Sequence, residues 1–134
     1  TYNLSSFIMK ENDITYRIIG AIYKVYRALG PGLLESIYEE ALTYQLVLDG
    51  LKVERQVNIP IIYQGKELAD KLKLDILVED QIIVELKAVK ELLDVHYKQL
   101  LTYLKLATLH IGLLVNFQTA NIQNEIHRVI NGYR

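Results

Sequence analysis

Residues 72–89 constrain the fold more than any other stretch of the chain. They read as two strands of alternating polarity joined by a tight polar turn at residues 79–81. Because side chains alternate between the two faces of a strand, each strand is expected to have one apolar face. The expected apolar faces are Leu72, Leu74, Ile76 and Val78 on the first strand, and Ile82, Val84, Leu86 and Ala88 on the second.

Charged side chains on the opposite faces are the sharpest functional signal. Asp75 lies on the first strand, and Glu85 and Lys87 lie on the second. Ionised groups in a hydrophobic sheet cost free energy unless they pair, bind a metal or stay wet. The turn brings the strands together, so two carboxylates can converge on one hard divalent cation such as Mg²⁺ or Mn²⁺. Lys87 would then orient an attacking water or stabilise charge on a phosphate.

The same spacing has a simpler interpretation. Lys87 and a glutamate could form a cross-strand salt bridge, with Asp75 as a solvated residue at the edge of the sheet. Patterns of one aspartate followed by Glu-x-Lys occur by chance in many hairpins. The spacing alone therefore leaves both interpretations open.

The composition limits the class of protein. The chain has 134 residues, 51% of them hydrophobic and 23% charged, which is typical of one globular domain. We expect an N-terminal arm over residues 1–11 and a single domain over residues 12–134. No cysteine is present, which excludes disulfides and is compatible with the reducing cytoplasm, where we expect the protein to act. No apolar run is long enough to span a bilayer, so no membrane partner is expected. The net charge of −1 requires that any contact with nucleic acid come from a local basic surface.

Two helices are expected before the hairpin. The first covers residues 12–29, capped by Asn12 or Asp13, with apolar residues at three- and four-residue intervals. Gly20 lies inside it, where a close neighbour would explain the missing side chain. A Gly-Pro-Gly segment ends this helix, and a second helix is expected over residues 33–49.

The rest of the chain alternates strands with one further helix. We expect strands at residues 51–57, 59–63, 67–79, 82–89, 111–117 and, less regularly, 125–130, and a helix over residues 95–107 capped by Asp94. Pro60 indicates an edge or a kink in its strand. The order α-α-β-β-β-β-α-β-(β) predicts an α/β or α+β domain, a mixed sheet with helices packed on it.

Five other polar side chains are candidates for the site. Glu35 lies in the first turn of the second helix, where it could simply complement the helix dipole. Gln99 and Tyr103 share one helical face and could present an amide and a phenol to a substrate, or pack against the sheet with polar tips. Lys71 and Lys73 could meet phosphates, or could form a charged strand that discourages aggregation.

Several other chemistries find no support in the sequence. His96, His110 and His127 lack the spacing of a zinc ligand set. No glycine-rich phosphate loop is present, so no nucleotide cofactor is expected. No serine has the context of a nucleophile elbow. Ten tyrosines, against two phenylalanines and no tryptophan, indicate half-wet surfaces or an interface, which leaves a homo-oligomer open.

Residues 32–38 read Gly-Leu-Leu-Glu-Ser-Ile-Tyr, a G-x-x-E-x-x-Y signature. Together with residues 75–78, 83–89, 99–105 and 112–117, this signature makes the chain similar to the GxxExxY family, which is placed in the PD-(D/E)XK nuclease superfamily. The resemblance implies a restriction-endonuclease-like fold, with a central mixed sheet flanked by helices. It also implies a Mg²⁺- or Mn²⁺-dependent phosphodiesterase that cleaves nucleic acid, with DNA favoured over RNA.

The resemblance assigns roles to the central residues. Glu35 matches the acidic residue of the first core helix, Asp75 the metal-binding aspartate, and Glu85 and Lys87 the E-x-K strand. A Mg²⁺ or Mn²⁺ ion would be held by Asp75, Glu85 and the Leu86 backbone carbonyl, with Glu35 binding a second ion or its water. Lys87 would position or activate the attacking water.

The remaining assignments concern the substrate. Gln99 and Tyr103 look like the Q-x-x-x-Y element of the RecB-like branch and would steady the substrate backbone, with Lys71 and Lys73 near its phosphates. Tyr26 stands where the family usually has a histidine late in the first helix. The alternative function is a catalytically silent module that binds nucleic acid or protein and retains the nuclease fold.

Overall fold

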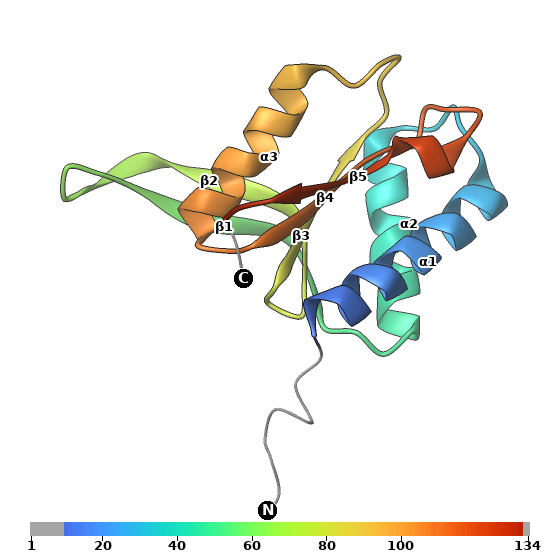
Figure 1. Ribbon diagram of the computed structural model, residues 1–134, viewed down its shortest axis with the longest axis horizontal. Helices are drawn as coiled ribbons and strands as arrows, with labels where there is room; N and C mark the ends of the chain where they lie inside the picture. The colour runs from blue at the N-terminus through green and yellow to red at the C-terminus, as the bar shows by residue number, and fades with distance from the viewer. Residues whose placement is uncertain (1–9, 133–134) are drawn as a thin grey trace, which may run out of the picture.

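The computed structural model describes residues 10–132 as a five-stranded sheet with helices on both faces (Figure 1). Along the chain lie α1 (Glu11–Leu29), α2 (Glu35–Leu48), β1 (Val53–Tyr63), β2 (Lys66–Val78), β3 (Ile82–Lys87), α3 (Asp94–Ala107), β4 (Ile111–Asn116), the short 3₁₀ helix η2 (Ile122–Glu125) and β5 (Ile126–Ile130). Of the predicted arm over residues 1–11, residues 1–9 lie outside the described residues. Within the described part of the chain, no helix combines the length and apolar character needed to cross a membrane.

The sheet has the order β1-β2-β3-β4-β5 and is mixed, because β3 and β4 are parallel whereas the other neighbours are antiparallel. This confirms the predicted class, a mixed sheet with helices packed on it. All six residues of β4 are buried, as expected for a strand covered on both faces. The weak strand predicted near the end of the chain is present as β5.

The prediction of two strands before the hairpin is wrong, because residues 53–63 form the single strand β1. Pro60 lies inside it, paired with Lys71 of β2. A proline is tolerated there because β1 is the edge strand and needs no second row of N–H donors. The turn residues Gln64 and Gly65 have φ of 49° and 81°, and positive φ at both central residues is typical of a tight two-residue hairpin turn. The β1–β2 hairpin extends well beyond the rest of the sheet (Figure 1).

Two hydrophobic clusters fill the space between sheet and helices. The first lies beneath α1 and α2 and the second beneath α3. The predicted common face of β2 is wrong, because the strand contributes to both clusters. Ile76 and Val78 belong to the first cluster, whereas Leu72, Leu74 and Leu77 belong to the second. The second strand of the hairpin behaves as expected, since Ile82, Val84 and Leu86 all belong to the first cluster.

The alternation along β2 therefore breaks at Asp75. Regular pairing of β2 with β3 stops at Ile76 and Val84, immediately before Asp75 and Glu85 would meet. Across the other edge of β2, Gln56 of β1 has a left-handed backbone with φ of 50°. Both partners of β2 are thus irregular at the level of Asp75.

The predicted helix caps are wrong in detail. α1 begins after Lys10, so Asn12 and Asp13 lie inside its first turn, where a carboxylate still favours the helix dipole. α3 begins after Leu93, whose N–H donates to Nδ1 of His96 at 2.9 Å. The predicted aspartate cap is instead the first residue of α3. The predicted end of α1 at the Gly-Pro-Gly segment is confirmed.

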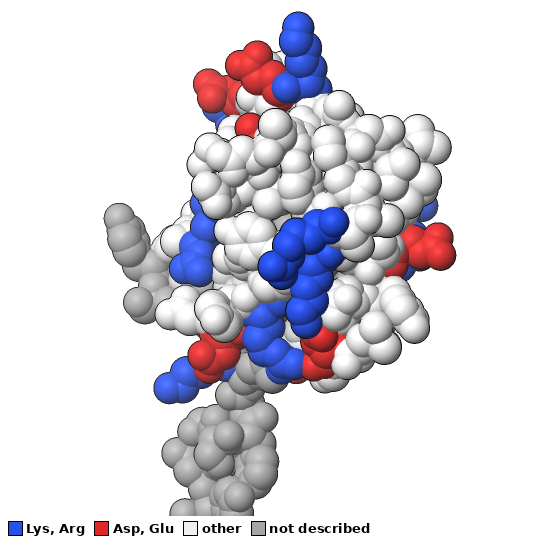
Figure 2. All heavy atoms as spheres, turned by 90° about the vertical axis from the view of Figure 1, so that its right-hand side faces the viewer, with Lys and Arg blue, Asp and Glu red and all other residues white. Residues whose placement is uncertain are grey.

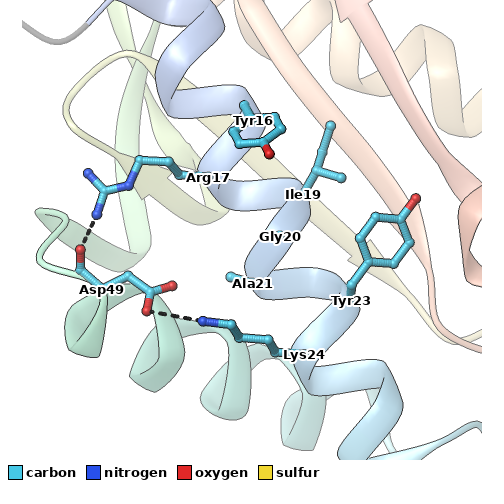
Figure 3. A pocket seen from close by; sticks show the side chains of 8 residues that line it. All are labelled: Tyr16, Arg17, Ile19, Gly20, Ala21, Tyr23, Lys24 and Asp49. Atoms are coloured by element: carbon cyan, nitrogen blue, oxygen red, sulfur yellow. Dashed lines mark hydrogen bonds and ion pairs between the residues drawn. The ribbon is translucent and has the colours of Figure 1, made fainter.

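The predicted close neighbour of Gly20 is not found among the described residues, since apart from the adjacent backbone of its own helix none of their atoms lies within 4 Å of the position that a Cβ would occupy. Gly20 lines an open hollow of about 430 Å³ on the outer face of α1 (Figure 3). At the border of the hollow, Arg17 donates to the backbone carbonyl of Asp49, and Lys24 Nζ lies 3.8 Å from Asp49 Oδ1. These contacts join α1 to the end of α2.

Candidate active site

Asp75 and Glu85 lie side by side where β2 and β3 part. The N–H of Asp75 donates to Glu85 Oε1 at 3.1 Å, and the N–H of Leu86 donates to Asp75 Oδ2 at 3.0 Å. In each bond the acceptor is a side-chain carboxylate of the opposite strand, whereas in a regular ladder it is a backbone carbonyl. The two carboxylates therefore hold the strands together at the point where regular pairing ends.

This pair is an unfavourable place for two negative charges. Glu85 is 5% exposed. Burial, and then the charge of Asp75, raise the pKa of Glu85 to about 9, and the charge of Lys87 opposes this only in part. The metal-free protein therefore retains a proton on the carboxyl pair at neutral pH. A divalent cation placed there would supply the positive charge that this proton now provides.

Glu35 reaches the same region from the first residue of α2. Burial raises the pKa of Glu35, the charge of Asp75 raises it further, and the charge of Lys87 lowers it. The fold thus brings Glu35, Asp75, Glu85 and Lys87 from three elements into one electrostatic group. Asp75 is half-buried and holds a backbone N–H, so it is not a solvated edge residue.

The donor set fits a hard divalent cation. Within residues 10–132, no three histidine, aspartate or glutamate side chains are already arranged as a metal-binding cluster. Mg²⁺ commonly binds one or two carboxylates and keeps several waters, so Asp75 and Glu85 suffice as protein ligands. No ion pair joins Lys87 to Glu85 in this part of the chain. A salt bridge therefore does not account for the buried charge.

Tyr38 fixes the loop that leads into α2. Its ring is fully buried and stacks on Phe117 with centroids 4.4 Å apart. Its hydroxyl donates to the carbonyl of Gly30 at 2.5 Å and accepts the N–H of Leu33 at 3.1 Å. This explains in physical terms why a tyrosine follows Glu35 at a spacing of three residues, because the tyrosine holds the start of the helix that carries the glutamate.

Replacing Tyr38 with phenylalanine is expected to lower the free energy of unfolding by about 1 to 2 kcal/mol. The ring stack on Phe117 would remain, but two backbone groups would lose their hydrogen-bond partner. Chemical denaturation measures the change. Tyr16→Phe is the matched control, because Tyr16 is 79% exposed and its change should stay within about 0.5 kcal/mol. Equal losses in the two variants would contradict the role given to the Tyr38 hydroxyl.

A buried network next to Glu35 was missed from the sequence. Glu39 is 6% exposed and accepts hydrogen bonds from Arg55 Nε at 3.1 Å, Arg55 Nη2 at 2.9 Å and Gln56 Nε2 at 2.8 Å. These bonds tie α2 to β1, and the charge of Glu39 also raises the pKa of Glu35. The available signal was the four-residue spacing of the two glutamates, which places them on one helical face.

Asn116 was also missed, although it ends an otherwise apolar strand. Its buried amide accepts the N–H groups of Val89 at 3.0 Å and Gln118 at 3.2 Å, and donates to the Val89 carbonyl at 2.8 Å. Asn116 pairs with Lys87 in the β3–β4 ladder. It therefore fixes the end of the strand that carries Lys87.

Tyr26 has a structural contact at the position where the resemblance leads one to expect a histidine. Its hydroxyl donates to the carbonyl of Thr119 at 2.5 Å. In the same loop, Gln118 Oε1 accepts the N–H of Gly32 at 2.9 Å. Both bonds join the loop after β4 to the region around α1 and α2.

α3 brings one predicted substrate residue close to the carboxyl pair. The helix packs tightly on β4, since a Cβ on Gly112 would lie 2.9 Å from Leu100 Cδ1. Burial raises the pKa of Tyr103, and the charges of Glu85 and Asp75 raise it further. The Tyr103 hydroxyl thus remains protonated near the pair, whereas Gln99, one helical turn earlier, is exposed.

The two predicted lysines lie on the exposed side of β2. Lys73 pairs with Asn58 of β1, and Lys71 Nζ lies 3.7 Å from a carboxylate oxygen of Glu67. Four residues of extended chain, roughly 13 Å, separate Lys71 from Asp75. The fold therefore does not bring Lys71 to the carboxyl pair, and it leaves Lys73 exposed two residues away.

Comparisons with known proteins agree with this fold. A family model described as the PD-(D/E)XK nuclease superfamily matches residues 12–129. A solved structure described as the crystal structure of SSO0001 is similar, with a TM-score of 0.58 and 23% sequence identity over 74% of this chain and 50% of that chain. The chain thus spans about half the length of that protein, and the likeness shows the fold alone. No curated protein matches the sequence.

Proposed function

Because the chain belongs to the PD-(D/E)XK nuclease superfamily, we propose that it is a nuclease of the GxxExxY family that hydrolyses phosphodiester bonds, with DNA favoured over RNA. Its mixed sheet flanked by helices is the restriction-endonuclease-like fold. The observation that best supports the proposal is the buried Asp75–Glu85 pair, with Glu35 and Lys87 acting on it. Two adjacent buried carboxylates cost free energy unless a proton or a cation compensates their charge.

The acidic residues would hold a divalent cation, and nucleases of this superfamily generally use such ions. We assign Asp75, Glu85 and the backbone carbonyl of Leu86 to Mg²⁺ or Mn²⁺, and Glu35 to a second ion or its water. When bound, the ion would act as a Lewis acid that stabilises charge on the phosphoryl and leaving oxygens. The N–H of Leu86 donates to Asp75, which keeps the strand that carries Glu85 in register with the aspartate.

The other residues would act on water and on the substrate. The half-buried Lys87 would hold the attacking water and donate to a phosphate oxygen, because its ammonium group offers three donors. The protonated Tyr103 hydroxyl would donate to the substrate backbone. Gln99 and Lys73 would make further contacts at the exposed rim, with Lys71 meeting a more distant phosphate.

The test is cleavage of supercoiled plasmid, single-stranded DNA and RNA by the purified protein. We expect cleavage with Mg²⁺ or Mn²⁺ and none with a chelator. Lys87→Ala should lower the rate at least about a hundredfold. Lys90→Ala, an exposed lysine three residues away, should retain the activity and controls for a contaminating nuclease.

Two outcomes would contradict the proposal. Equal cleavage by the wild-type protein and Lys87→Ala would contradict the catalytic role proposed for Lys87. Binding of nucleic acid that a chelator leaves unchanged, with no turnover of any substrate, would instead indicate the catalytically silent module.

A further inference from the structure

α2 has a second apolar face that is largely exposed in the described chain. Its core side is buried through Tyr38, Leu42 and Leu46. The outer side carries a stripe with alternating three- and four-residue spacing, the pattern of a helix–helix contact. The stripe residues are Leu34, which immediately precedes the helix, Ile37, Ala41, Tyr44 and Leu48. The four large ones are 71%, 42%, 65% and 60% exposed, whereas Ala41 is half-buried against the first cluster.

A hollow lies at the middle of this stripe. It has a volume of about 330 Å³ and is lined by Ala41 with Leu29, Ile37, Glu40 and Tyr44. Tyr44, one turn after Ala41, is 65% exposed at its border. One helical surface thus carries both a hollow, next to a small side chain, and a large side chain that protrudes. An interface between two identical copies related by a two-fold axis requires both on the same surface.

The order of side-chain sizes also suits self-association. Read from either end, the stripe presents two large residues, one small residue and two large residues, centred on Ala41. Two antiparallel copies that cross at Ala41 would place Leu34 and Ile37 of one copy beside Tyr44 and Leu48 of the other. The small central residue allows the helices to approach closely. We propose that the outer face of α2 is a two-fold interface between two copies of this chain.

The exposed area agrees with this occupant. Val47 and Leu29 adjoin the stripe with 54% and 40% exposure. With the four large stripe residues they expose the equivalent of more than three whole side chains, on the order of 500 Å² at roughly 150 Å² each. That is most of the ~800 Å² that each partner buries in a stable interface. Figure 2 shows a broad area without charged side chains on the side of the molecule with α1 and α2, next to a central group of lysine and arginine side chains.

The sharpest test uses the absence of cysteine from the chain. Under mild oxidation, Ala41→Cys should form a disulfide-linked dimer, because residue 41 of each copy would meet its counterpart near the two-fold axis, within about 7 Å. Thr102→Cys, at an exposed position on α3, is the matched control and should remain unlinked. In light scattering, the wild-type protein should have twice the 15.5 kDa mass of one chain.

A substitution on the stripe gives a second, independent measurement. Tyr44→Glu should raise the dimer dissociation constant at least a hundredfold without changing the circular dichroism spectrum. Tyr63→Glu, at a 62%-exposed position on the β1–β2 hairpin, should leave the dimer intact. A monomeric wild-type protein would overturn the proposal, as would a dimer that survives Tyr44→Glu. Neither result depends on nuclease activity.

Discussion

Replacing Asp75 with alanine is expected to lower metal-dependent cleavage about a thousandfold or more while the protein still folds. The substitution removes a carboxylate proposed to hold the cation, and it also removes the acceptor of the Leu86 N–H. The strand that carries Glu85 would then lose its fixed position relative to β2. Ligand and geometry would be lost together, which is why this effect should exceed that of Lys87→Ala.

Cleavage rates and calorimetric binding of Mn²⁺ measure the two consequences separately. Asp70→Ala is the matched control, because Asp70 lies on the same strand and is exposed. It should retain both cleavage and Mn²⁺ binding. If Asp75→Ala cleaved as fast as wild type, or bound Mn²⁺ equally well, the assignment of the cation site would be wrong.

The metal-free protein is expected to lose stability as the pH rises from about 5 to 9. Burial and the neighbouring Asp75 raise the pKa of Glu85 from its ordinary value of 4.5 to about 9 in the folded protein. The folded state therefore retains a proton that the unfolded state has released. The stability linked to this proton is complete below pH 4.5 and is lost as the pH rises through 9, by at most about 1.4 kcal/mol per pH unit. Glu35, whose pKa is also raised, adds in the same direction.

Denaturation curves across this range, with and without Mg²⁺, measure the effect. Glutamine at position 85 cannot ionise, so Glu85→Gln should flatten the dependence of the free energy of unfolding on pH. The exposed control Glu91→Gln should leave this dependence unchanged. Mg²⁺ should stabilise the wild type more at pH 8 than at pH 6, because metal and proton compete for one carboxyl pair. A wild-type curve as flat as that of Glu85→Gln would contradict the raised pKa.

Features set by nearby residues were predictable from the sequence. The apolar stripe and the Gly-Pro-Gly segment placed the end of α1 at Leu29. The turns between β1 and β2 and between β2 and β3 lie where polar residues interrupted the alternation, with Glu79 and Asp80 in the left-handed conformation. The continuous apolar run at residues 111–117 predicted the fully buried strand β4. Each of these follows from local chemistry that tertiary contacts do not override.

Features set by distant contacts were not predictable. The period-two pattern of residues 72–78 placed Leu74 and Ile76 on one face, whereas the bonds between Asp75 and its neighbours across the hairpin separate them. The bonds of Glu39 to Arg55 and Gln56 join residues 16 and 17 positions apart. No local rule reports such pairs.

The candidate site falls between these two cases. The motif and the resemblance identified Glu35, Asp75, Glu85 and Lys87, and the fold brings them together. Their catalytic roles remain a proposal. The supporting roles of residues such as Tyr38 and Asn116 emerge only from the folded arrangement.

The break in β2 at Asp75 has a consequence for efforts to engineer this protein. An ideal hairpin would keep one face throughout and pair every backbone group with its partner strand. A redesign for thermal resistance would therefore favour a β-branched residue at position 75 and a fully regular strand. Such a redesign would remove the very defect that sets two carboxylates side by side. Robustness and chemistry thus make opposite demands on this one residue.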